Sequence, residues 1–177
     1  MKNYVSLSAA AVVFFVGAAL AQTPYAGMQT RSIKALSDQQ IEDLRSGRGM
    51  GLALAAELNG YPGPSHLLEL AGKIGLSDVQ LNSVRGMFES MKKEAIPIGE
   101  RLIEQEAALD KLFGEHAITA EKLSAATAEI GATQAQLRAA HLKYHLSTAA
   151  MLEPPQIQRY SALRGYHDDL QEHRHHH

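Results

Sequence analysis

The 177-residue sequence contains no cysteine and no tryptophan, and aromatic residues make up only 6% of it. Without cysteine the chain can form no disulfide framework and carries no lipidated cysteine anchor, so its stability must come from packing alone. It also lacks an excess of charge of either sign, with 17 basic and 19 acidic residues. Because nucleic-acid binding needs a basic face, we expect no nucleic-acid partner.

Sequence signatures of an enzyme are absent as well. There is no nucleophile–base pair, no pair of catalytic carboxylates in a defined context and no cofactor loop. Glycines 47, 49 and 51 in "SGRGMG" resemble a phosphate loop only superficially, because no strand precedes them and no G-K-[ST] follows. We therefore expect a protein that is not an enzyme and requires no cofactor.

The first 21 residues have the layout of a secretory signal peptide. A lysine at position 2 precedes an apolar run over 9–20, and Ala-Leu-Ala at 19–21 suits a cleavage site after Ala21. Loss of Lys2 would take the formal net charge from −2 to −3. The apolar run is shorter than the roughly 20 residues of a membrane span, so export without a stable membrane anchor is favoured over a retained anchor.

The rest of the chain predicts an all-α fold, a long antiparallel helical hairpin with short flanking helices. Alanine, leucine, glutamate and glutamine, which favour helix, are abundant. Residues 22–35 are interpreted as a flexible lead-in, 36–166 as the helical domain and 167–177 as a histidine-rich tail. Within the domain, we expect a weak or bent helix over about 38–58 or close packing through its glycines, a stop at 59–65, and short helices at 66–75 and 154–165.

Two long segments carry apolar residues at alternating steps of three and four, which is the heptad pattern of packed helices. The first runs from Leu81 to Leu112 and the second from Leu123 to Met151, with a turn at 113–119 between them. Because this turn is short, the two helices must pack as an antiparallel hairpin. Pro97 is expected to kink the first helix.

A short motif, leucine followed by three residues, glutamine and an apolar residue, occurs three times. It comprises Leu36, Ser37 and Gln40; Leu76, Ser77 and Gln80; and Leu152 and Gln156, where Glu153 replaces the serine. Serine followed three residues later by glutamine is a capping box, and the flanking apolar residues form a hydrophobic staple. Each copy therefore predicts the start of a helix.

The second and third copies, "LSDVQ" at 76–80 and "LEPPQ" at 152–156, resemble the paired Leu-Thr-x-x-Gln motifs of the Spy/CpxP family. The resemblance covers about 66–166 and extends to the metal-responsive ZraP and CnrX proteins, whereas 25–65 matches no part of the short Spy-type plan. It implies a periplasmic homodimer that acts as an ATP-independent chaperone or envelope-stress adaptor for unfolded envelope proteins. The alternative implied by the metal-responsive relatives is a heavy-metal sensor or resistance protein that binds copper, nickel or zinc and works with a sensor protein.

Candidate metal ligands lie within the hairpin. His141 and His145 are four residues apart on one helix face, which is metal-ligand spacing, and no hydrolytic base lies between them. If the turn is centred near His116, they lie opposite Met91 and Met87. Two imidazoles facing two thioethers suit a transition ion such as copper, nickel or zinc. The alternatives are that both histidines lie at the surface and both methionines fill the core.

Other histidines offer weaker candidates. His66 is expected to approach the same end of the hairpin, although it also suits an ordinary loop histidine. The tail is expected to chelate metals with low specificity. Its candidate ligands are His173, His175, His176 and His177.

Overall fold

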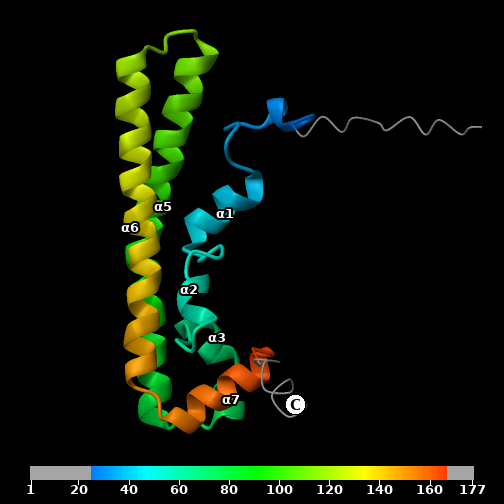
Figure 1. The fold of residues 1–177 in the computed structure, drawn as a ribbon, viewed down its shortest axis with the longest axis vertical. Coiled ribbons are helices and arrows are strands. Elements are labelled where there is room, and N and C mark those ends of the chain that lie inside the picture. The colour runs from blue at the N-terminus through cyan, green and yellow to red at the C-terminus, as the bar shows by residue number, and fades with distance from the viewer. Residues whose placement is uncertain (1–24, 167–177) are drawn as a thin grey trace, which may run out of the picture.

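The computed structural model describes residues 25–166, and the expected signal peptide, the start of the lead-in and the histidine-rich tail lie outside this range. The described part is all-helical and contains no strand. Helix α5 (Asp78–Gly114) and helix α6 (Ala120–Ala150) pack together as the antiparallel hairpin that the heptad pattern predicts (Figure 1). Helix α5 continues through Pro97 as one helix of 37 residues. None of the helices between residues 25 and 166 combines the length and apolar composition needed to cross a membrane.

The remaining elements lie along one side of the hairpin and across its lower end (Figure 1). They are the 3-10 helix η1 (Met28–Thr30) and helices α1 (Asp38–Ser46), α2 (Leu54–Glu57), α3 (Pro64–Glu69), α4 (Ala71–Ile74) and α7 (Pro154–Arg164). The expected single helix over 38–58 is wrong, because α1 ends where Gly47 takes a left-handed backbone conformation with φ 69°. The only other helix within residues 38–58 is α2, which has four residues.

Two apolar clusters hold these layers together. The upper cluster joins Ile33, Leu36 and α1 to the middle of the hairpin, so the end of the predicted lead-in is packed against the domain. Helix α1 approaches α5 closely at Gly99, where an added Cβ would lie 2.6 Å from the carbonyl oxygen of Leu44. The lower cluster joins α3, α4 and α7 to the base of the hairpin, around the fully buried Tyr160.

Capping boxes start α1 and α5 at the predicted serines. Ser37 and Ser77 accept hydrogen bonds from the backbone N–H groups of Gln40 and Gln80, and the glutamine side chains accept from the serine N–H groups in return. In the third motif, Gln156 accepts from the N–H of Glu153 at 2.9 Å. Local capping therefore operates at all three motifs, as predicted.

The second and third motifs also bind each other, which the sequence did not predict. The amide nitrogen of Gln80 donates to Oε1 of Gln156 at 2.9 Å, and that of Gln156 donates to Oε1 of Gln80 at 3.0 Å. The same two nitrogens lie 3.1 Å from the carbonyl of Met151 and 3.0 Å from that of Gly75, respectively. This reciprocal pair, called here the glutamine clasp, joins the start of α5 to the start of α7.

Candidate functional site

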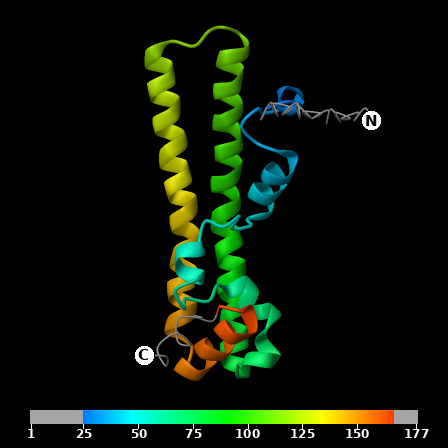
Figure 2. The same cartoon turned by 45° about the vertical axis from the view of Figure 1, so that its right-hand side comes forward.

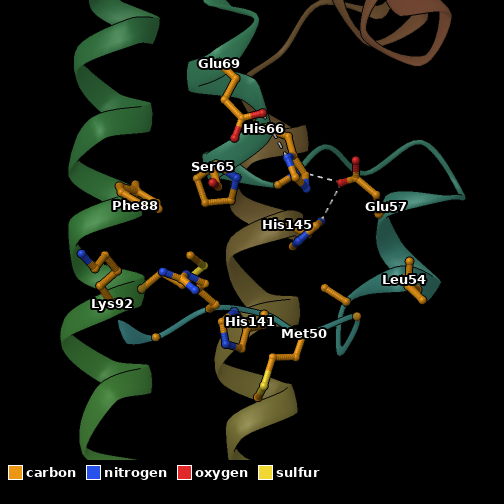
Figure 3. Close-up of a pocket in the computed structure, with 18 of the residues that line it drawn as sticks. Met50, Leu54, Glu57, Ser65, His66, Glu69, Phe88, Lys92, His141 and His145 are labelled. Atoms are coloured by element: carbon orange, nitrogen blue, oxygen red, sulfur yellow. Dashed lines mark hydrogen bonds and ion pairs between the residues drawn. The ribbon is translucent and has the colours of Figure 1, made fainter. Parts of the chain in front are cut away.

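A pocket of about 610 Å³ lies between the lower half of the hairpin and residues 47–69, called here the cover segment (Figure 3). Helix α6 contributes two histidines to it and α5 contributes a phenylalanine, a methionine and a lysine. The side chains that matter below are Met50, Glu57, His66, Phe88, Met91, Lys92, His141 and His145. Its size falls in the range of ligand-binding pockets in proteins.

His145 is buried and held in a defined orientation at the inner wall of the pocket. Its Nδ1 lies 2.7 Å from the carbonyl oxygen of Tyr61. A carbonyl can only accept a hydrogen bond, so in the neutral ring the proton sits on Nδ1 and the lone pair on Nε2. An added Cβ on Gly63 would lie 2.6 Å from both Nε2 and Cε1, so this glycine leaves free the space beside the lone pair.

His141 is more deeply buried than His145, and one of its ring nitrogens has no hydrogen-bond partner among the described residues. It is 2% exposed, and its Nε2 is buried with no hydrogen-bond partner among the described residues. Burial, followed by the proximity of His145, lowers the pKa of His141, so that its neutral form is favoured. Gly49 packs against the other side of the ring, with an added Cβ at 3.5 Å from Nδ1. A buried, neutral and unpaired imidazole nitrogen is suited to bind a ligand.

A buried carboxylate, Glu57, ties the cover segment to α7 at one end of the pocket. It accepts hydrogen bonds from the hydroxyl of Tyr160, from that of Tyr166 at 3.2 Å and from the N–H of Gly63 at 3.2 Å. Its oxygens also lie 3.7 Å from Arg164 Nε and 3.7 Å from His145 Nδ1. Burial and then the adjacent carboxylate raise the pKa of the Tyr160 hydroxyl, which keeps it protonated as a donor.

The structure gathers most of the predicted ligands of the hairpin. Met91, His66, His141 and His145 all line the pocket. His66 lies at its edge, where its Nδ1 is 3.4 Å from Glu69 Oε2. The tail histidines lie outside the described residues. No group of three or more histidine, aspartate or glutamate residues between 25 and 166 is arranged to hold a metal ion.

Met87 lies outside the pocket lining, because the hairpin register differs from the expected one by about one helical turn. The Thr148 hydroxyl lies 3.7 Å from Met87 Sδ, and Tyr144 and Lys143 both contact Glu94. Helix α5 runs to Gly114 and α6 begins at Ala120, so the turn is centred beyond His116. The shift places Met87 opposite Thr148.

Apart from His66, the residues of the cover segment were not predicted from the sequence to be part of the site. Met50 and Glu57 line the pocket, and Tyr61 orients His145 although it is 84 residues away in the chain. The available signal was the spacing of glycines in "GRGMG" and "YPGP", because Gly49 and Gly63 are the residues that approach the two rings. Glycine permits such close approach of backbone to side chain.

The fold and the site therefore define an all-helical hairpin protein with a histidine-lined pocket under a cover segment. Comparisons with protein-family models, with curated proteins and with solved structures give no match to this chain.

Proposed function

We propose that this protein binds a transition metal ion in the pocket and acts, without enzymatic activity, as an exported metal-sensing or metal-resistance protein of the Spy/CpxP kind. The observation that carries this proposal is the orphaned Nε2 of His141, which is buried beside His145 in a pocket that Met91 also lines. An unpaired buried nitrogen costs about 1–3 kcal/mol, which coordination of a metal would offset. In this proposal the protein is a homodimer that reports metal to a sensor protein.

Electrostatics and hydrogen bonding also support metal binding. A ligating imidazole must be neutral, and burial lowers the pKa of His141 in that direction. A ligating histidine usually donates its other N–H to a carbonyl or carboxylate, and His145 does so to Tyr61. The imidazole pair would hold the ion and the surrounding cover segment would exclude water from it.

Calorimetric titration with copper, nickel and zinc tests this function. The protein is the mature chain with every histidine from position 167 onward replaced by alanine, so that tail chelation does not contribute. We expect one ion per chain, with binding lost in His141→Ala and in His145→Ala. The matched control is His116→Asn, which removes a histidine from the α5–α6 turn and keeps a residue that tolerates the local φ of 53°. Metal binding by the unmodified mature chain that is absent from this variant would refute the proposal.

Client binding is the second candidate function, and a different observation favours it. Four apolar side chains of the cover segment are substantially exposed: Met50 (41%), Leu54 (53%), Leu58 (56%) and Tyr61 (42%). Apolar side chains that gather at one surface often mark sites of protein interaction. A chaperone of the Spy/CpxP kind would use such a surface to hold unfolded envelope proteins.

Suppression of aggregation tests the chaperone function. At stoichiometric amounts the mature protein should suppress aggregation of a chemically denatured model client, and Leu54→Ser with Leu58→Ser should weaken that effect. Val79→Ser is the matched control, because Val79 is 76% exposed at the start of α5. Absence of suppression by the unmodified protein would reject this function.

A further inference from the structure

The chemistry of the pocket restricts which metal it can take. Zinc in proteins is usually bound by four ligands drawn from cysteine, histidine and carboxylate side chains. The chain has no cysteine, and no three histidine or carboxylate residues in the described range are arranged around one point. The nearby carboxylates are engaged, Glu57 by two tyrosine hydroxyls and Glu69 by His66. Histidine and carboxylate side chains of the described range therefore do not by themselves complete a zinc site of this kind.

Thioether sulfur is the other donor that lines the pocket. Met91 is 6% exposed on α5, on the wall facing α6, and Met50 enters from the cover segment. Soft thioether ligands suit monovalent copper, whereas zinc takes its sulfur ligands from cysteine thiolate, which this chain lacks. We propose that the pocket is a site for monovalent copper, bound by the two histidines of α6 and by Met50 and Met91. This inference rests on the proposed metal-binding function and names its metal and its third and fourth ligands.

The backbone at Met50 supports a functional role for this residue. Met50 has a φ of 44°, and the only other non-glycine residue with positive φ in the described range is His116. Such a conformation is uncommon for a long side chain and tends to persist where the site requires it. A Cβ added to Gly49 would lie 3.5 Å from His141 Nδ1, and Figure 3 shows Met50 beside His141. The residue with positive φ therefore lies beside the imidazole ring whose Nε2 lacks a partner.

The charges around the pocket favour a monovalent ion as well. Arg48, Lys92 and Arg164 line it together with the histidines. Arg48 is paired with Asp43 and Arg164 with Glu57, whereas Lys92 lies over the Phe88 ring. Repulsion from a nearby cation is half as large for a monovalent as for a divalent ion at the same distance. Because thioether ligands are uncharged, they do not offset this repulsion, and the preference for a monovalent ion remains.

Competition for copper tests the inference. The mature chain with its histidines from 167 onward replaced by alanine is titrated anaerobically with a chromophoric Cu(I) chelator under ascorbate, and separately with Zn(II) and Ni(II). Met50→Leu keeps the size and the backbone strain but removes the sulfur. We expect Met50→Leu and Met91→Leu each to weaken Cu(I) binding by about tenfold or more, since loss of even an outer-sphere partner costs 10–100-fold in metal sites. X-ray absorption of the copper-loaded protein should show copper–sulfur scattering that falls in Met50→Leu.

The matched control is Met87→Leu, because Met87 contacts Thr148 and lies outside the pocket lining. It should leave Cu(I) affinity unchanged. Cu(I) binding that requires His141 and His145 but is equally tight in Met50→Leu, with no sulfur scattering, overturns this inference and leaves the proposed metal function standing. If none of the three ions binds, or if binding survives loss of both histidines, the proposed function falls too.

Discussion

At the scale of single residues, the site depends on how two histidines are buried. His145 is satisfied by the Tyr61 carbonyl, whereas His141 keeps one nitrogen without a partner. Both rings lie on α6, but their environments differ. The cover segment places the Tyr61 carbonyl against His145 and Gly49 near His141. The i, i+4 pattern alone could indicate neither fact, since both depend on residues more than 80 positions away in the chain.

The lowered pKa of His141 predicts a pH-dependent stability. The unfolded chain takes up a proton at this residue below about pH 6.5, while the folded state resists protonation. The unfolded state then binds more protons, so the free energy of unfolding should fall as the pH drops through this range. Urea unfolding from about pH 7.5 to about pH 5.5 should show this loss, and it should be smaller in His141→Asn. A pH dependence that is equally reduced in the His116→Asn control contradicts the assignment to His141.

Gly63 provides a second prediction at this scale. Its backbone, with φ −83° and ψ 152°, suits any residue, so a substitution there tests space alone. In Gly63→Ala the new methyl would lie 2.6 Å from the His145 ring, and overpacking of this kind costs about 1–3 kcal/mol. Gly49→Ala is the control, because its methyl would make an ordinary 3.5 Å contact with His141. Equal stability of the two variants in urea would show that the His145 ring is free to move.

At the scale of elements, the glutamines of the second and third motifs have two tasks. Each caps its own helix and each pairs with the other across the base of the hairpin. The capping could be predicted from the sequence because it involves residues three positions apart. The pairing could not, because Gln80 and Gln156 are separated by the whole hairpin and meet only through its fold.

A double-mutant cycle should reveal the clasp. Gln80→Ala and Gln156→Ala each leave an amide without its partner, at a cost of about 1–3 kcal/mol. The double variant removes both, so we expect a coupling free energy of about 0.5–3 kcal/mol from urea unfolding. Gln40→Ala is the matched control, since Gln40 makes the same capping box and has no hydrogen bond to another helix among residues 25–166. Strict additivity of the two single effects would mean that the paired amides contribute nothing beyond capping.

At the scale of the whole molecule, packing is concentrated in the lower and middle parts of the hairpin. Between Ile103 on α5 and Ile130 on α6, no residue is buried. The short helices cover the hairpin below this stretch, and its tip rises above them (Figure 2). Stability in such a molecule is unevenly distributed, because local opening is opposed mainly by buried apolar contacts.

Hydrogen exchange should therefore divide the hairpin into two zones. Amides within 106–127 should exchange at least about tenfold faster, after correction for intrinsic rates, than those around Val84, Ala95 and Leu137. Val84 is buried in the lower cluster, and Ala95 and Leu137 are buried in the upper cluster, so this second group serves as the internal reference. Uniform protection along α5 and α6 would show that the two-helix tip is stabilised by contacts beyond those of a single chain.

The sequence alone determined where the main helices begin, that two of them are long and that they form an antiparallel hairpin. These features depend on capping and heptad spacing, which act over seven residues or fewer. It also indicated His141, His145, Met91 and His66 as candidate ligands. It did not determine the end of α1 at Gly47, because one left-handed glycine is sufficient to stop a helix.

Only the tertiary structure decided the hairpin register and the contents of the pocket. A small shift in the turn moves every facing pair, so Met87 lies against Thr148 instead of a histidine. The cover segment, which follows no periodic pattern, brings Met50, Glu57 and Tyr61 to the histidines of α6. Contacts between residues so far apart in the chain depend on how complete elements pack, and no local pattern encodes that packing.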